Sequence, residues 1–395
     1  MVSGSDVVAR APGRAGSPET VAVAGLAALA VAMGIGRFAF TPILPMMQED
    51  AGVSVAEGGW LASANYLGYL LGALSAMAIP ARPVTAIRAA LLAISLATLG
   101  MGLAYRLPAW IVLRALAGVA SAWVLIFGSA WCLERLAPLR RPLLSGTVFA
   151  GVGAGIASAG GICLVLMHAG ASSAQAWYSL GVFALVVTAV IWRTFGAEHG
   201  VSPHDGQRST DRAPRWDGEA VRLVLCYGTF GFGYIIPATF LPVMARQAIR
   251  DPWVFGWSWP IFGIAAAVST PVAVASLRLV GNRRLWILSH VVMALGVALP
   301  SFWPGILGVM LAALFVGGTF MVITMAGMQE ARQVGGPHPT ALMAAMTAAF
   351  AVGQIAGPLL VSYFVRADSD FSAALLLASC LLLASAWALS RGRAR

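Results

Sequence analysis

One arginine inside the first long apolar run limits what this chain can fold into. The run opens near Val21, and Arg37 lies past its middle, in the stretch GIGRFAFTPILPMM that spans residues 34–47. An unpaired charge at that depth of a membrane helix costs ~2.5–3.5 kcal/mol on insertion scales. Glycines and prolines surround it, and lipid allows such helix breaks only where protein or a water-filled cavity satisfies the freed backbone. We therefore expect a loosened helix inside a larger bundle.

The same stretch recurs in the second half of the chain. Residues 231–244 read GFGYIIPATFLPVM, displaced by 197 positions, and Arg37 falls opposite Tyr234. This recurrence indicates two copies of one membrane unit, with the charge kept only in the first. The matched pairs are Gly34 with Gly231, Gly36 with Gly233, Pro45 with Pro242, and Met47 with Met244.

Composition places the chain in a bilayer. Hydrophobic residues make up 59% and charged residues 10%, against roughly a quarter charged in soluble domains. All 25 basic residues are arginines, scattered at loop ends, so lipid headgroups and topology explain the net charge of +10 better than nucleic acid does. The four cysteines lie in apolar runs without metal-ligand spacing, so we expect buried thiols, no metal and no cofactor.

Apolar segments of about 20 residues predict membrane-spanning helices. The chain has twelve of them, which predicts an all-α membrane protein with two pseudo-symmetric six-helix bundles. The expected parts are a tail (1–20), an N-terminal bundle (21–196), a linker (197–219), a C-terminal bundle (220–391) and a tail (392–395). The expected spans are 21–47, 57–80, 84–105, 108–133, 142–168, 174–196, 220–245, 253–280, 285–303, 305–333, 339–366 and 370–390.

The arginines also predict the orientation. With the N-terminus in the cytoplasm, nineteen arginines fall inside and four outside, and Arg37 and Arg114 stay within the membrane. A miscount of one helix would scramble this separation. The bias therefore favours twelve helices with both termini cytoplasmic.

The chain resembles the major facilitator superfamily over nearly its whole length. The motifs that carry the resemblance are Arg114-Ala-Leu-Ala-Gly118, the turn Leu133-Glu134-Arg135 followed by Arg140-Arg141, and the glycine-rich run from Gly151 to Gly161. The loop from Pro80 to Arg88 departs from the family pattern because it has no Asp. Residues 34–47 resemble more closely the YbfB/YjiJ-type branch. The resemblance implies the major facilitator fold and alternating access, in which a central site faces each side of the membrane in turn.

Arg37 is the strongest candidate for substrate binding. A guanidinium can hold a carboxylate or phosphate through two hydrogen bonds, and charges within membranes are usually functional. The alternative is a structural pair with helix-end carbonyls or tyrosine hydroxyls. The other candidates are polar or aromatic, and aromatic residues at helical spacing are also typical of a lipid-facing or core position. They are Asn65, Tyr66, Tyr69, Trp123, Phe127, Tyr234 and Gln354.

Residues for coupling or gating are harder to find, because every acidic residue lies at a helix end or in a loop. Proton coupling must then use Glu134 or Glu330 near the inner face, a histidine or the substrate's own carboxylate, or it is absent. Arg114 and Arg135 complete this set, and Arg114 either packs and couples within the bundle or extends outward to the interface. We expect interfacial positions for His168 and His290 and for four tryptophans, namely Trp253, Trp257, Trp259 and Trp303.

Together these features predict a secondary active transporter of the bacterial inner membrane, monomeric, with the solute and the bilayer as its partners. We expect the solute to be a small organic anion or amphiphilic metabolite, with proton coupling left open. Proton-driven efflux of drugs or toxic compounds is an alternative, but it usually needs a buried carboxylate. An enzyme or a channel is disfavoured, because the chain lacks a polar catalytic cluster and a filter sequence.

Overall fold

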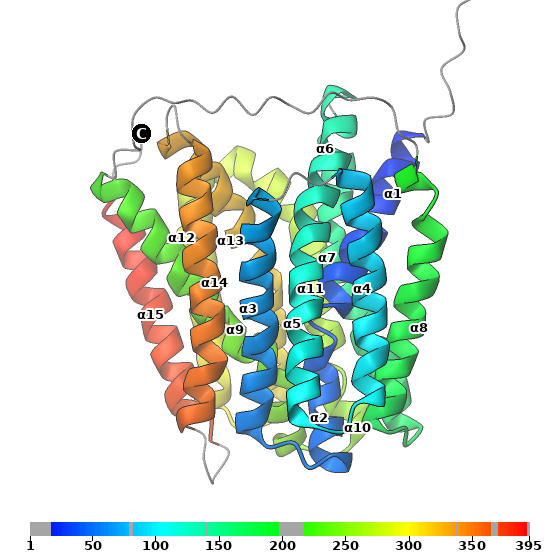
Figure 1. Cartoon of the computed structure of the whole chain (residues 1–395). Coiled ribbons are helices and arrows are strands. Elements are labelled where there is room, and N and C mark those ends of the chain that lie inside the picture. Colours follow the sequence, from blue (N-terminus) through cyan, green and yellow to red (C-terminus); the bar gives the residue numbers. More distant parts are fainter. Residues whose placement is uncertain are drawn as a thin grey trace, which may run out of the picture.

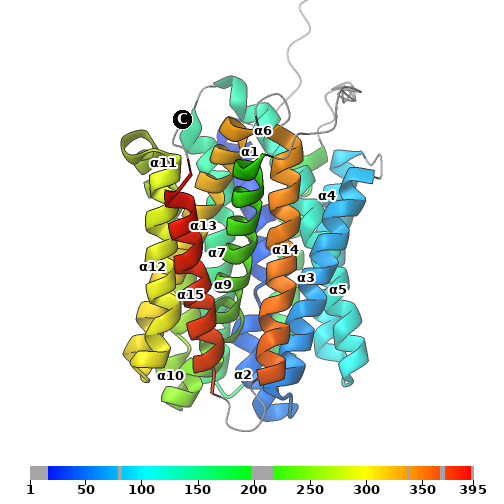
Figure 2. The same cartoon turned by 90° about the vertical axis from the view of Figure 1, so that its left-hand side faces the viewer.

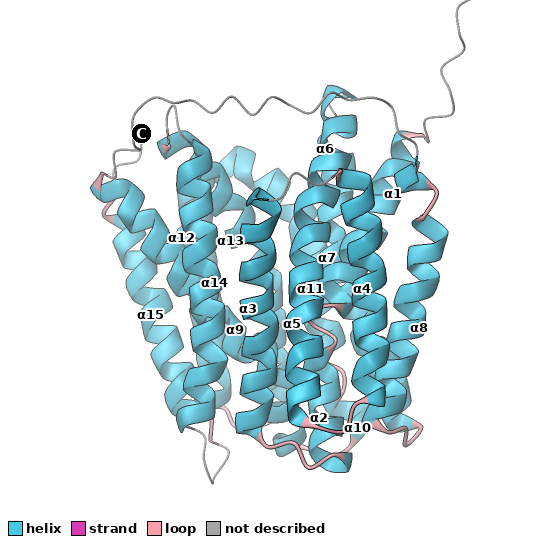
Figure 3. Cartoon of the chain, in the orientation of Figure 1, coloured by secondary structure: helices cyan, strands magenta, loops and turns pink. Residues whose placement is uncertain are grey.

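Every regular element of the described chain is helical (Figures 1 and 3), in a computed structural model that describes residues 17–78, 82–139, 141–196, 217–335, 339–364 and 370–392. The linker and tails predicted from the sequence lie almost wholly outside these ranges. The elements are α1 (Pro18–Leu29), η1 (Ala30–Ile35, π-helix), α2 (Phe40–Asp50), α3 (Val55–Ala78), α4 (Pro83–Leu103), α5 (Leu107–Trp123), η2 (Val124–Gly128, π-helix), α6 (Ser129–Leu136), η3 (Ala137–Leu139), α7 (Pro142–His168), α8 (Ser173–Ile191), η4 (Thr194–Gly196), α9 (Gly218–Ala248), α10 (Pro252–Phe255), α11 (Ser258–Val280), α12 (Asn282–Phe302), α13 (Ile306–Val334), α14 (Pro339–Phe364) and α15 (Ser372–Ser390).

Most of these helices are built to cross a membrane. In the described residues, 10 helical segments are long and apolar enough to do so. The first of these segments extends from Pro18 to Asp50 and includes α1, η1 and α2. Helices α3 and α11, with 24 and 23 residues, are also long but fall outside that set. The structure thus supports a multi-pass, all-helical membrane protein, while this measure does not reach the predicted count of twelve.

The long helices stand side by side and nearly parallel to one another (Figures 1 and 2). Helix α1 begins and α15 ends at the same end of the bundle, the upper end in Figure 1, whereas α2 ends and α10 lies at the lower end. The chain therefore starts and finishes its helical part on one side, as an even number of crossings requires.

The first helix is unwound around Arg37, as its glycines and prolines predict. The N–H of Gly36 donates to the carbonyl of Val31 at 2.9 Å, and that of Phe38 to Met33 at 3.1 Å, so the regular i to i−4 pattern is lost. Residues 36–39 form a turn before α2. Carbonyls freed in this way must find donors on neighbouring helices.

A proline in α9 frees a carbonyl that joins the two copies of the repeat. Pro242 has no N–H to offer the carbonyl of Ala238, four residues earlier. The hydroxyl of Thr41 donates to that carbonyl at 2.8 Å. Thr41 and Ala238 are 197 residues apart, the offset of the sequence repeat, so this bond lies where equivalent positions of the two copies meet.

A second pair of contacts follows the offset of the sequence repeat. Arg88 in α4 donates to the carbonyl of Trp192 at the end of α8, at 2.8 Å. Arg283 in α12 donates in the same way to Leu389 at the end of α15, at 3.0 Å. The two acceptors are again separated by the repeat offset. In each copy an arginine thus donates a hydrogen bond to a carbonyl at the end of that copy's last long helix, α8 or α15.

Small residues bring helix backbones into direct contact. At these positions even a methyl group would overlap the backbone of the facing helix, which is how small-residue ladders let membrane helices pack. The pairs are Gly68 with Ala115 (α3 and α5), Gly155 with Ala30 (α7 and η1), and Gly353 with Gly228 (α14 and α9).

The outer surface of the bundle is apolar, as a lipid-facing surface should be. Large hydrophobic side chains are exposed on many of the helices, including Leu96, Leu116 and Val190, which is 75% exposed. Two expectations from the sequence are wrong here. Trp259 is fully buried, stacked 4.7 Å from Phe262, and is not part of an interfacial belt. Cys380 is exposed, whereas the other three cysteines are buried.

The close approach of α7 to η1 gives a matched test in one helix. Gly155→Ala should lower the thermal unfolding temperature in detergent by several degrees, because its methyl group meets the backbone of Ala30. Gly161→Ala in the same helix meets no atom within 4 Å and should be neutral or stabilising by roughly 0.5–1 kcal/mol. Equal unfolding temperatures for the two variants would contradict this packing.

Candidate functional site: an arginine between the two repeats

Arg37 points into the bundle and not into lipid. Arg37 is 2% exposed, although it carries the only charge of the first apolar run. The guanidinium carbon lies 4.0 Å from the centroid of the Tyr69 ring, and 5.3 Å from those of Tyr66 and Phe38. Aromatic faces attract a cation through their negative quadrupole, so these rings cover and stabilise the charge.

An amide connects Arg37 with its counterpart in the second copy. Arg37 donates from Nη2 to Oε1 of Gln354 at 2.9 Å, and Nε2 of Gln354 donates to the hydroxyl of Tyr234. Gln354 and Tyr234 are both buried, at 0% and 1% exposure. Arg37 and Tyr234 occupy equivalent positions of the sequence repeat, and the side chain of Gln354 in α14 therefore joins them.

Tyr234 is itself fixed by aromatic stacking. Its ring lies between those of Phe320 and Phe350, with centroids 5.7 and 5.6 Å away and interplanar angles of 4° and 9°. Stacked rings of this kind restrict rotation of the phenol. The hydroxyl is thus held at a defined position facing Gln354.

The charge of Arg37 has no carboxylate to neutralise it near the middle of the membrane. Every acidic residue that the structure describes lies close to a helix end or in a loop. Moreover, Nε of Arg37 is buried without a hydrogen-bond partner. A buried donor left unpaired costs about 1–3 kcal/mol, and more when it is charged. The site therefore has an unused capacity to bind an anion.

Arg114 and Asn65 hold the unwound backbone of the first helix in place. Arg114 donates from Nη2 to the carbonyl of Arg37 at 2.9 Å, and from Nη1 to that of Gly36 at 3.4 Å. Asn65 donates from Nδ2 to the carbonyls of Gly36 and Arg114, at 3.1 and 2.8 Å. Arg114 is 2% exposed, so the alternative in which it extends outward is wrong. Its contacts are those of a positioning residue.

Tyr66 contributes a second polar contact between the repeats. Its hydroxyl lies 3.2 Å from Oγ1 of Thr239, next to the Thr41–Ala238 bond. Asn65, Tyr66, Tyr69, Tyr234 and Gln354 are thus gathered around Arg37. Thr41 and Thr239 belong to the same cluster, but the sequence interpretation missed them because short hydroxyl side chains are common in membrane helices.

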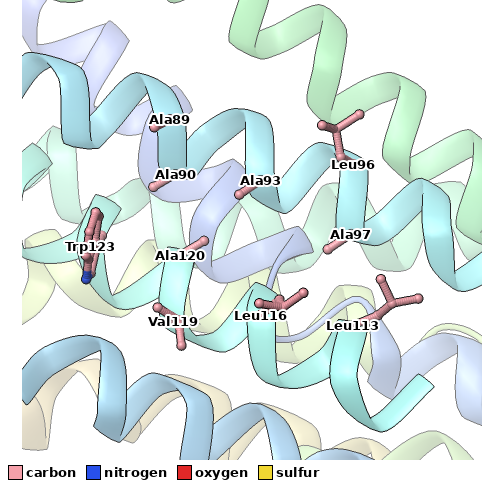
Figure 4. Close-up of a pocket in the computed structure, with 10 residues that line it drawn as sticks. All are labelled: Ala89, Ala90, Ala93, Leu96, Ala97, Leu113, Leu116, Val119, Ala120 and Trp123. Atoms are coloured by element: carbon pink, nitrogen blue, oxygen red, sulfur yellow. The ribbon is translucent and has the colours of Figure 1, made fainter. Parts of the chain in front are cut away.

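Trp123 and Phe127 lie elsewhere. Trp123 lines an apolar groove of about 450 Å³ between α4 and α5, on the lipid-facing surface of the bundle (Figure 4). Its Nε1 donates to Ser75 at 2.9 Å, and the ring of Phe127 meets it edge-on at 6.0 Å. The structure does not bring these two aromatic residues to Arg37.

Apart from Arg114, the residues expected to couple or gate lie near the upper end of the bundle. Glu134 is exposed at the end of α6, and Arg135 lies over the Trp131 ring at 3.9 Å. Glu330 is buried and accepts a hydrogen bond from Arg283 at 3.2 Å, and Arg283 also pairs with Glu219. This network ties α9, α12 and α13 together.

His290 is not interfacial, contrary to the expectation from its position in the sequence. It is fully buried, with Nδ1 3.3 Å from the carbonyl of Trp286, and its ring packs against those of Phe230 and Trp286. His168 is exposed at the end of α7, as expected, beside the ring of Trp253.

A further contact between the repeats was missed at the lower end. Arg246, at the end of α9, forms an ion pair of 3.3 Å with Glu49 of α2 and donates to the carbonyl of Pro45. It borders an open pocket of about 650 Å³ lined by Gln48, Glu49, Val55, Val243, Arg246, Gln247 and Arg250.

The sequence matches the family described as "Uncharacterised MFS-type transporter YbfB" over residues 29–390. The chain belongs to this family. It is therefore a multi-pass membrane transporter of the major facilitator superfamily, and not an enzyme. The family match covers both repeats and the whole Arg37 cluster.

Solved structures show the same fold. The nucleoside transporter NupG, in a mutant form, superposes with a TM-score of 0.74 at 12% identity, over 94% of this chain and 99% of that one. The D-xylose-proton symporter superposes with a TM-score of 0.72 at 12% identity, over 94% and 97%. No curated protein matches the sequence. At such low identity the likeness concerns the fold and not the solute.

The positioning role of Arg114 is tested within its own helix. Arg114→Lys should lower the thermal unfolding temperature by several degrees, because one ammonium cannot replace both guanidinium hydrogen bonds to the unwound turn. Arg106→Lys, at the exposed start of α5, is the matched control and should leave it unchanged. If the two variants unfold at the same temperature, Arg114 does not hold the turn.

Proposed function

We propose that this protein is a secondary active transporter that moves a small organic anion across the bacterial inner membrane by alternating access. One observation carries the proposal: the guanidinium of Arg37 is buried between the repeats, bonded to an amide and covered by aromatic rings. A solute anion bound there would supply the missing negative charge. Because the site touches both repeats, the solute would meet both moving parts.

The proposed topology follows the sequence prediction. Helices α3 and α11 complete twelve spans, and the upper end of Figure 1 faces the cytoplasm, as the bias of the arginines favours. Residues 21–196 and 220–391 then form the two six-helix bundles, with 197–219 as a cytoplasmic linker. We expect the monomer to be the transporting unit.

The charge of the site distinguishes this proposal from the efflux alternative. A lipophilic cation would be repelled by Arg37, and none of the described acidic residues lies in mid-membrane to attract it. Glu330, the most buried acid described, is already paired with Arg283 near the upper end. The site therefore favours an anion, and the solute's own carboxylate is the group best placed to carry any coupled proton.

The conformation supports a carrier that is closed at its lower, proposed external end. Seven polar contacts of the described residues join the repeats, at the level of Arg37 or towards that end. They are Arg37–Gln354, Thr41–Ala238, Ser63–Ile355, Tyr66–Thr239, Ser362–Ala56, Arg246–Pro45 and Arg246–Glu49. Opening to the outside would require these contacts to break.

The anchoring role of Arg37 is tested by uptake into vesicles that contain the purified protein, with a set of labelled organic anions. Arg37→Ala and Arg37→Lys should reduce uptake of any transported anion by at least ~10-fold, since Lys lacks the paired donors. Arg106→Ala, exposed at the lower end, should retain uptake. Full uptake by both Arg37 variants would refute the anion site.

The closure of the lower end is tested by thiol labelling. In a Cys380→Ser background, Thr41→Cys should react slowly with a membrane-impermeant maleimide, because Thr41 is 2% exposed. Arg246→Gln should increase that rate several-fold by removing the bonds to Glu49 and Pro45. Arg250→Gln, exposed in the same pocket, is the control. An unchanged rate in the Arg246 variant would show that this ion pair does not close the end.

A further inference from the structure

The contact between Arg37 and Gln354 uses only one of the two nitrogens along one edge of the guanidinium. In arginine, Nε and Nη2 direct their N–H bonds in parallel from the same edge, the geometry that matches the two oxygens of a carboxylate. Here Nη2 donates to Oε1 of Gln354 at 2.9 Å, while Nε is buried and has no partner. A single amide oxygen thus occupies an edge of the guanidinium that can bind two oxygens.

We propose that the side-chain amide of Gln354 is an internal stand-in for the substrate's carboxylate, which displaces it on binding. This inference rests on the proposed function and names its substrate class as carboxylates. A carboxylate on the Nε and Nη2 edge satisfies the orphaned donor and replaces a neutral hydrogen bond by two charge-assisted ones. It therefore exceeds the amide as a ligand of Arg37.

The surroundings of the guanidinium favour a planar group. Tyr69 covers one face at 4.0 Å, and Tyr66 and Phe38 lie 5.3 Å from its centre. The edge formed by Nε and Nη2 lies in the plane of the guanidinium, and Gln354 bonds it only at Nη2. A planar carboxylate can bond this edge in that plane, whereas a tetrahedral phosphate directs its remaining oxygens towards the rings.

Displacement of Gln354 has a consequence for the scaffold. The same amide donates to Tyr234, so it links the first helix with α9 through α14. When Gln354 leaves Arg37, the hydrogen bond between α14 and the first helix is lost, while the bonds Thr41–Ala238 and Tyr66–Thr239 remain. The contact that the substrate removes is thus one of those that join the two repeats.

The test compares two Gln354 variants by thermal-shift titration of the purified full-length protein with benzoate, succinate and inorganic phosphate. Gln354→Met keeps a long side chain but cannot bond Arg37, so a carboxylate should saturate it at a concentration about three- to tenfold lower than the wild type, because no competitor remains. Gln354→Glu places a carboxylate permanently beside Arg37. It should raise the unfolding temperature and abolish the response to benzoate and succinate.

Arg37→Met/Gln354→Glu is the control, because the glutamate then has no guanidinium to pair with and should destabilise the protein relative to Arg37→Met alone. The inference is overturned if Gln354→Met binds the carboxylates no more tightly than the wild type, or if phosphate is the stronger ligand. It is also overturned if Gln354→Glu still responds to carboxylates. The proposed function fails separately, when the wild type and the Arg37 variants transport organic anions equally well.

Discussion

A charged guanidinium that is 2% exposed inside a membrane bundle needs partners from the protein or its ligand, and the rest of this structure depends on how Arg37 finds them. Its faces rest on aromatic rings, one donor reaches Gln354, and one donor remains unpaired. The described residues supply no carboxylate at that depth. In the function proposed above, an anionic solute is the partner that completes the site.

Unwinding of the first helix is the structural condition for this arrangement. The π-helical segment and the turn at residues 36–39 free backbone carbonyls that a regular helix would use internally. Arg114 and Asn65 donate to those carbonyls, so a second buried guanidinium stabilises the backbone that presents the first. The two arginines therefore differ in their contacts: Arg114 positions the backbone, and Arg37 is the residue proposed to bind the solute.

Local features allowed part of this to be predicted from sequence. Glycines, prolines and one charge in an apolar run predicted the break at Arg37, and the repeat placed Tyr234 opposite it. The bridge by Gln354 could not be predicted, because it joins residues 317 positions apart and depends on how α14 is rotated. Depth along an apolar run also says nothing of side-chain direction, which is why Trp259 and His290, both fully buried, were wrongly expected at the interface.

The most direct test of the account is an experimental structure of the protein with its transported solute bound. The account predicts a solute oxygen within hydrogen-bond distance of Nε and Nη2 of Arg37, with Gln354 moved away. A solute bound elsewhere, with the Arg37–Gln354 hydrogen bond intact, would contradict it.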